Sequence, residues 1–243
     1  RLSLVRRFAA YLNANGVDVP IIPTGLLPAK KPRAVPFIYS QDDIDALLAA
    51  CGTTFTSERI AATVRTVIGL LTATGLRISE ALNLTVDDID VEGDVLTIRA
   101  GKSAERLVPI DPSTTAALTA YIALPARIST RPDPNGPVFV TAKGTGYVYI
   151  SFFALFKRVR QAAGLTPRGR ARPRLHDIRH TFATAHMTSA YRHNSDPARV
   201  LSLLATWLGH SDAAHTYWYL TATGELMALA ANMLEADPEG GSR

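Results

Sequence analysis

The chain has 243 residues, of which 47% are hydrophobic and 19% are charged, and its formal net charge is +5. This composition is typical of a globular protein with a sizeable core, and no uninterrupted apolar run reaches the roughly 18 residues that a membrane span needs. The single cysteine, Cys51, excludes an internal disulfide framework and favours a reducing compartment, so we expect a cytoplasmic protein. No signal peptide is predicted, because arginines interrupt the apolar residues at the start.

The first part of the chain predicts a helix and a linker. Residues 2–14 carry apolar side chains at helical spacing. Residues 19–36 contain five prolines and a basic cluster, which is typical of an extended linker. Because one helix cannot bury a core by itself, we expect residues 1–18 to be the last helix of a truncated N-terminal domain. Residues 37–236 are then the main domain, and residues 237–243 are a flexible tail.

The main domain is predicted to be mainly α with a small antiparallel β-sheet, an α+β fold. Strands are expected over Val95 to Arg99 and Arg106 to Ile110, around a loop that contains Lys102. A third short strand is expected at 138–140, and the acidic stretch 86–94 is interpreted as a solvated turn. Helices are predicted at about 41–50, 57–74, 77–83, 113–123, 150–163, 176–190, 197–207, 213–220 and 225–234.

A basic run lies between Lys157 and Arg179, with eight Lys or Arg residues and one acid, Asp177. Such a run is either a solvated face or a nucleic-acid surface, and composition alone does not choose between them. The candidate DNA-binding residues are Lys157, Arg158, Arg160, Arg168, Arg170, Arg172 and Arg174.

Two arginines and a histidine are candidates for binding a phosphate. His176 and Arg179 are three residues apart, so a helix presents them on one face near its N-terminus, where an anion is favoured. Arg77 follows Gly75, which permits a sharp turn. Two arginines suit the two non-bridging oxygens of a phosphodiester. Taken alone, the His-x-x-Arg pair could cap a core helix, and Arg77 could pair with Glu80.

The segment 208–220 contains the Gly-His turn at His210 and, nine residues later, Tyr219. A phenol is a weak nucleophile near neutral pH because its pKa is near 10, so it needs neighbours that take its proton and neutralise an anion. Two residues of helix turn a side chain by about 200°, so Tyr217 and Tyr219 cannot both face one site. In this order, the following set resembles the catalytic residues of the tyrosine recombinases, the phage integrase family, over roughly residues 37–235: Arg77, Lys102, His176, Arg179, His210 and Tyr219.

The resemblance implies a site-specific DNA recombinase or integrase that forms a 3′-phosphotyrosine and releases a 5′-hydroxyl. Tyr219 would be the nucleophile and His176 would accept its proton. Arg77, Arg179 and His210 would stabilise the transition state. Lys102 would protonate the leaving oxygen, with Lys143 as the alternative because the hairpin loop is short. No cofactor is expected, neither ATP nor a metal, and the spacing of the remaining histidines fits no compact metal site: His180, His186, His193 and His215.

The resemblance also implies partners. We expect double-stranded DNA and a homo-oligomer, a tetramer on paired sites, in a bacterial cytoplasm and at the nucleoid when bound. Residues 1–18 would end a core-binding domain that clamps DNA. The C-terminal helix 225–235 would dock on a neighbouring subunit or pack in cis through the stripe Leu226, Leu229, Ala230 and Met233. The alternatives are a type IB topoisomerase-like strand transferase and a catalytically silent DNA-binding regulator with the same fold.

Overall fold

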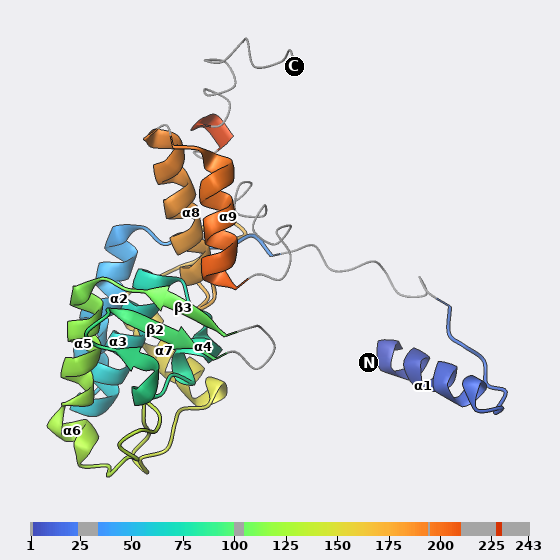
Figure 1. Ribbon diagram of the computed structural model, residues 1–243, viewed down its shortest axis with the longest axis horizontal. Helices are drawn as coiled ribbons and strands as arrows, with labels where there is room; N and C mark the ends of the chain where they lie inside the picture. Colours follow the sequence, from blue (N-terminus) through green and yellow to red (C-terminus); the bar gives the residue numbers. More distant parts are fainter. Residues whose placement is uncertain (1, 24–33, 100–104, 194, 210–226, 230–243) are drawn as a thin grey trace. The chain divides into compact units, whose positions relative to one another are not determined.

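The computed structural model describes residues 2–23, 34–99, 105–193, 195–209 and 227–229 (Figure 1). The chain divides into two compact units, residues 1–34 and 35–243, and each is described by itself. The first unit contains helix α1 (Leu2–Ala14), as predicted. The segment after α1 returns along it, since Nε of Arg6 donates to the carbonyl of Ile22 at 2.8 Å. In the described part of the chain, no helix combines the length and apolar character of a membrane span.

The second unit is mainly helical with one small sheet, which confirms the predicted fold class (Figure 1). The sheet has the order β1-β2-β3 and is antiparallel throughout. Its strands are β1 (Ile89–Asp90), β2 (Val95–Ile98) and β3 (Arg106–Pro109), and a short 3-10 helix, η1 (Val86–Asp88), precedes them. The α-helices are α2 (Gln41–Thr54), α3 (Glu58–Thr74), α4 (Ile78–Leu82), α5 (Pro112–Ile122), α6 (Pro125–Ile128), α7 (Tyr149–Ala162), α8 (Asp177–Arg192) and α9 (Pro197–Leu208).

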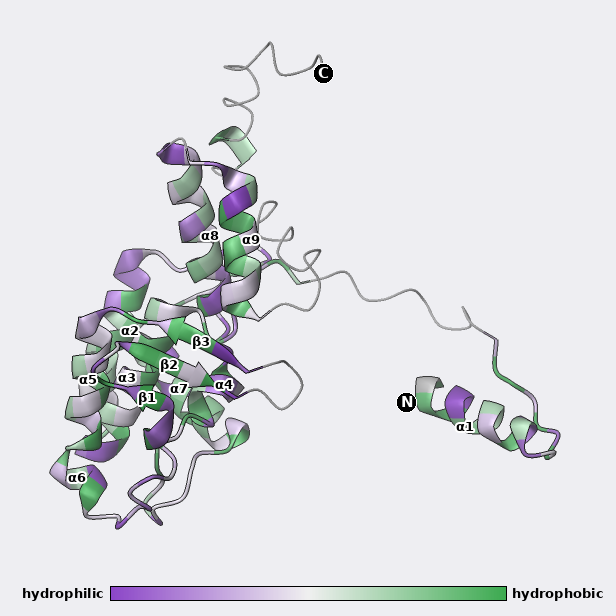
Figure 2. Cartoon of the chain, viewed as in Figure 1, coloured by the Kyte–Doolittle hydropathy of each residue, from purple (hydrophilic) through white to green (hydrophobic). Residues whose placement is uncertain are grey.

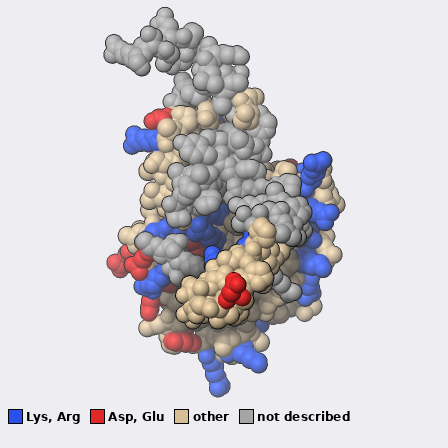
Figure 3. Space-filling view, turned by 90° about the vertical axis from the view of Figure 1, so that its right-hand side faces the viewer, with Lys and Arg blue, Asp and Glu red and all other residues tan. Residues whose placement is uncertain are grey.

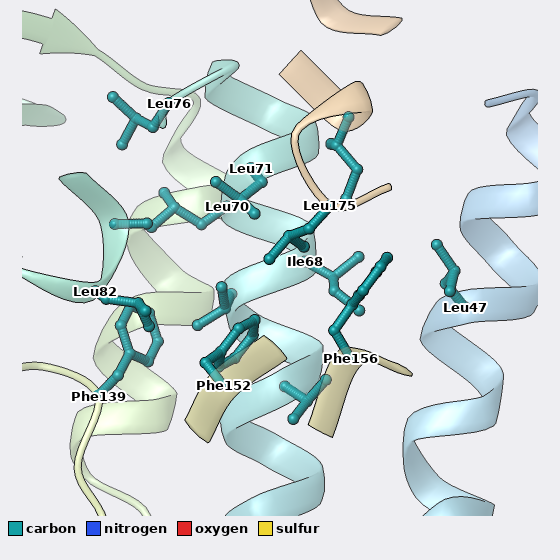
Figure 4. Packing of buried hydrophobic residues seen from close by; sticks show 14 of the residues in the cluster. Leu47, Ile68, Leu70, Leu71, Leu76, Leu82, Phe139, Phe152, Phe156 and Leu175 are labelled. Atoms are coloured by element: carbon teal, nitrogen blue, oxygen red, sulfur yellow. The ribbon is translucent and has the colours of Figure 1, made fainter. Parts of the chain in front are cut away.

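Helix α3 is the centre of the main core. It begins at the N-cap Ser57, whose side chain accepts from the backbone N–H of Ile60, and it contacts α2, α5, α7 and α8. Figure 4 shows how buried side chains from the neighbouring segments surround its leucines and Ile68. Burial of such side chains is the main stabilising contribution to the fold.

Helices α8 and α9 contribute a second apolar cluster. Phe182 and Met187 of α8 pack against the leucines of α9, and Trp207 connects this cluster with the main core. Figure 2 shows the hydrophobic residues concentrated on β2 and β3 and along α9. The two clusters therefore hold the end of α9 against the rest of the unit.

The predicted hairpin is present, and its register pairs Val95 with Pro109 and Ile98 with Arg106. Leu96, Ile98 and Val108 point into the core, as the two-residue period of a strand requires. The loop 100–104, which contains Lys102, lies outside the described residues.

Two local predictions are wrong. The acidic stretch 86–94 is not simply a solvated turn, because it contains η1 and β1, and Asp88 is buried, where it pairs with Arg99 and accepts from the backbone N–H of Thr85 at 2.9 Å. Residues 138–140 form no strand. All three are buried, and Val140 forms an isolated bridge with Gly146. The predicted helix at 213–220, and that at 225–234 apart from three helical residues at 227–229, lie outside the described residues.

Candidate active site

The turn after α3 presents Arg77. Gly75 ends the helix with φ of +64°, and a Cβ at this position would lie 2.5 Å from Cδ1 of Phe182, so both the backbone conformation and the close packing require glycine. Arg77 then begins α4, and its Nη1 donates to Oε1 of Glu80 at 2.7 Å. The side chain of Arg77 is 33% exposed, so its guanidinium can reach a ligand.

The first turn of α8 presents His176 and Arg179. Asp177 is fully buried, and its carboxylate accepts from the backbone and the side chain of Arg174, which fixes this turn. His176 is the N-cap residue and is exposed, whereas Arg179 is 2% exposed. The guanidinium of Arg179 donates to the carbonyls of Gly75 at 3.0 Å and Leu208 at 2.6 Å. Thus α8 is tied to the glycine turn before Arg77.

The end of α9 is capped by arginines from three separate segments. The carbonyls of the last residues of a helix have no partner within the helix. Here Arg106 donates to the carbonyl of Trp207 at 2.8 Å, Arg179 to that of Leu208, and Arg77 to that of Gly209 at 3.2 Å. Gly209 takes the left-handed conformation and directly precedes His210, which lies outside the described residues.

Glu80 lies between two arginines. Its carboxylate accepts from Nη1 of Arg77, from the backbone N–H of Arg77, and from Nη1 and Nη2 of Arg106 at 3.2 and 2.9 Å. Burial opposes its ionisation, but the hydrogen bonds from Arg106 and Arg77 outweigh burial and lower the pKa of Glu80. Glu80 is therefore a carboxylate near neutral pH.

Two histidines at the start of α8, His176 and His180, have lowered pKa values. His176 is an exposed residue, yet partial desolvation, followed by the charge of Arg179, lowers the pKa of its imidazole. Desolvation and the neighbouring His176 lower the pKa of His180 to about 4, and the two rings meet edge to face at 5.1 Å. His176 is thus neutral at pH 7 and can accept a proton.

The structure brings together three of the six predicted catalytic residues, namely Arg77, His176 and Arg179. Lys102, His210 and Tyr219 lie outside the described residues, so their positions remain predictions. The alternative lysine, Lys143, is exposed in a turn where Gly144 packs closely on the carbonyl of Thr130.

The basic run contains residues of two kinds. Arg168 pairs with Asp43 at 2.8 Å, and Arg174 pairs with the buried Asp177, so both have a structural role. Arg158 lies over the ring of Phe55, and Arg160 donates to the carbonyl of Pro173 at 3.0 Å. The view in Figure 3 shows Lys and Arg side chains along both edges of the face that it displays.

Three members of the run are exposed and form neither an ion pair nor a side-chain hydrogen bond with any other described residue: Lys157, Arg170 and Arg172. They are the best placed of the seven to meet a polyanion. Contact of the run with DNA stays a prediction.

Sequence reasoning missed Arg106 and Trp207. Arg106 is the partner of Glu80, and Nε1 of Trp207 donates to the carbonyl of Thr74 at 2.8 Å, which holds α9 against the end of α3. A signal for Arg106 exists, because strand alternation places it on the same inward face as Val108, while Leu107 between them is exposed.

Comparison with known proteins gives a consistent result. The phage integrase family matches residues 38–225. "Putative integrase/recombinase y4rB" of Sinorhizobium fredii is 38% identical over 245 residues, covering 97% of this chain and 77% of that protein. "Tyrosine recombinase XerD" of Xanthomonas campestris pv. campestris is 34% identical over 240 residues, covering 95% and 69%.

Solved structures share the fold. The crystal structure of XerA recombinase has a TM-score of 0.61 and 24% identity, covering 100% of this chain and 74% of that one. A lambda integrase dimer bound to a COC′ core site has a TM-score of 0.67 and 15% identity, covering 92% and 58%.

Proposed function

We propose that this chain, which belongs to the phage integrase family of tyrosine recombinases, cleaves and rejoins double-stranded DNA at specific sites through a 3′-phosphotyrosine. The observation that supports this most strongly is that Arg77 and Arg179 converge on the turn that leads to His210, while His176 lies in the same first turn of α8 as Arg179. Three segments far apart in the sequence supply this arrangement, namely the turn before α4, the first turn of α8 and the end of α9. Cations gather at one place, as a phosphodiester requires.

Arg77 is the phosphate ligand that is open to DNA. Among the described residues, its Nη1 donates to Glu80 and its Nη2 to the carbonyl of Gly209, so each nitrogen keeps a second N–H for a non-bridging oxygen. Arg179 lies deeper and is held by two carbonyls, which preorganises its charge. A preorganised cation stabilises the transition state without reorganising during the reaction.

The proposed cleavage step is a transesterification. The phenol oxygen of Tyr219 attacks phosphorus, the bond from phosphorus to the 5′-oxygen breaks, and the phenol proton passes to the neutral imidazole of His176. His210 donates a hydrogen bond to the phosphate, and Lys102 gives the 5′-oxygen a proton. A 5′-hydroxyl from a partner strand then reverses these steps. The number of phosphodiester bonds is conserved, so neither ATP nor a metal is needed.

We infer further that copies of the chain assemble on paired DNA sites through the helix predicted at 225–235. A pocket of about 330 Å³ on the second unit offers an apolar surface for a stripe of leucines and a methionine. It is lined mainly by hydrophobic side chains from the end of α3, the segment that joins β3 to α5, and helices α8 and α9, among them Phe182, Val200, Leu203, Leu204 and Trp207. A lambda integrase tetramer bound to a Holliday junction is among the structural neighbours, which favours the same assembly here.

A covalent-trapping assay tests the nucleophile. On a nicked suicide substrate, wild-type protein is expected to leave a protein–DNA band that resists SDS, whether or not EDTA is present. Tyr219→Phe should bind the DNA and leave no band, because only the attacking oxygen is removed. Tyr217→Phe is the matched control and should retain the band. The assignment is wrong if Tyr219→Phe still forms the adduct while Tyr217→Phe does not.

The same preparation separates the two alternatives. A type IB topoisomerase would relax supercoiled plasmid as a monomer without joining two duplexes. A silent regulator would bind DNA and form no adduct at all. Strand exchange between two sites supports the recombinase.

A further inference from the structure

We propose that Arg106 is a positioning residue that neutralises Glu80 and thereby keeps the charge of Arg77 available for the DNA phosphate. The proposal rests on the proposed function, because it concerns how the phosphate ligand Arg77 is held. Arg106 is the first residue of β3 and follows the loop of Lys102.

The contacts of Arg106 join three parts of the site. Its Nη1 and Nη2 donate to the two oxygens of Glu80 at 3.2 and 2.9 Å, and its Nε donates to the carbonyl of Trp207 at 2.8 Å. Its side chain is 10% exposed, and the guanidinium lies so close to Gly209 that a Cβ there would be 3.0 Å from Nη1. One side chain therefore connects α4, β3 and the last turn of α9.

The charges in this group decide what Arg77 can do. Glu80 and Arg77 alone would form a neutral ion pair, and the carboxylate would compete with DNA for the guanidinium of Arg77. With Arg106 on the other side, one carboxylate lies between two guanidinium groups, and the group keeps one net positive charge. Because Arg106 is buried and Arg77 is 33% exposed, the surplus charge faces outward at Arg77. An ion pair of low exposure is screened little by salt, so this balance matters at physiological ionic strength.

Another buried arginine shows what a purely structural role looks like. Arg127 donates to the carbonyls of Val138, Ile122 and Pro137, and no carboxylate is its partner among the described residues. Its loss would leave carbonyls unpaired without changing the charge at the site. Arg127→Gln is therefore the matched control for the loss of a buried arginine.

The test compares adduct formation on the suicide substrate for wild type, Arg106→Gln, Glu80→Gln/Arg106→Gln, Arg106→Lys and Arg127→Gln, with a thermal melt of each. Arg106→Gln should slow cleavage by roughly 10² or more, comparable to the loss of a preorganised donor. The double variant also removes the carboxylate that Arg106→Gln leaves uncompensated. Because Glu80 and Arg106 are in contact, the two substitutions should not be additive, and the double variant should cleave about tenfold faster than Arg106→Gln. Arg106→Lys keeps the charge but loses the paired hydrogen bonds to Glu80, so it should cleave faster than Arg106→Gln and more slowly than wild type. Arg127→Gln should lower the melting temperature with little change in cleavage by the folded protein.

Each result decides the matter. If wild type forms no adduct, the proposed function fails. If wild type cleaves and Arg106→Gln cleaves as fast as Arg127→Gln, or if the double variant is no faster than Arg106→Gln, the charge argument is overturned. Should Arg106→Gln not fold, Arg106→Lys decides, because a folded Arg106→Lys that cleaves 10² or more slower than wild type contradicts a role for the charge.

Discussion

Replacing Gly75 with alanine tests whether the turn before Arg77 is both strained and closely packed. Alanine in the left-handed conformation costs roughly 1 kcal/mol. The new Cβ would also lie 2.5 Å from Cδ1 of Phe182 and 3.1 Å from Cδ2 of Leu208. Overpacking of this kind typically costs about 1–3 kcal/mol. We therefore expect a loss of about 2–4 kcal/mol in the free energy of unfolding.

Phe182 has little room to move. Its ring lies 4.3 Å from that of His186 and 6.3 Å from that of Trp207, so a shift would disturb the indole that holds α9. Gly164 is the matched control. It also has a positive φ, +68°, but nothing lies within 4 Å of its Cβ position. Gly164→Ala should cost only the conformational part, about 1 kcal/mol.

Urea unfolding followed by circular dichroism measures both variants. Because Arg179 binds the carbonyl of Gly75, the folded fraction of Gly75→Ala should also form less adduct than wild type. Equal losses of stability for Gly75→Ala and Gly164→Ala would refute the packing argument. Asparagine separates backbone strain from packing, because it tolerates a positive φ better than alanine does. Gly164→Asn should therefore be more stable than Gly164→Ala, whereas Gly75→Asn should remain destabilised, because its Cβ still meets Phe182.

Three other predictions follow from the site. Arg77→Ala and Arg179→Ala should each slow adduct formation by roughly 10² to 10³. Only Arg179→Ala should clearly lower the melting temperature, because it leaves the carbonyls of Gly75 and Leu208 unpaired. Equal melting temperatures of the two variants would contradict this. His180 has its pKa lowered to about 4 in the fold, so its contribution to stability is complete above the unfolded pKa near 6.5 and is lost as the pH falls from 6.5 towards 4. Unfolding of His180→Gln should depend less on pH in this range, and an unchanged profile would rule His180 out as the cause. Finally, Lys157→Gln, Arg170→Gln and Arg172→Gln should each lower the salt slope of DNA binding by about one without changing stability. Arg174→Gln should instead destabilise the fold, because Asp177 loses its ion-pair partner. The reverse result would show that Arg174 binds DNA and that the other three residues support the fold.

Local sequence signals predicted most of the fold because they act over a few residues. The N-caps Ser40 and Ser57 and the terminator Gly75 set helix ends that lie close to those predicted. Residues 138–140 were misjudged because three consecutive buried residues satisfy a strand pattern, while pairing depends on a partner that the local sequence does not reveal. Asp88 was misjudged because Arg99, its partner, is eleven residues away.

The candidate site could be predicted only as far as motif spacing reached. The spacing indicated Arg77, His176 and Arg179 because a helix turn and a glycine turn each depend on only a few neighbouring residues. Arg106 was missed because its role comes from Glu80 and Trp207, which are 26 and 101 residues away in the sequence. Such contacts are created by folding and leave little trace near the residue itself.

The capping of α9 limits how the length of this chain can vary. Three successive carbonyls, those of Trp207, Leu208 and Gly209, each meet a different arginine, so the end of the helix must have one rotation about its axis. Inserting or deleting one residue in α9 would turn these carbonyls by about 100° and move them by about 1.5 Å, and all three contacts would be lost together. Residues 132–135 carry no such constraint, because their hydrogen bonds within the described structure join only residues of the same turn. Related sequences should therefore differ in length at 132–135 and hardly at all between Pro197 and Gly209.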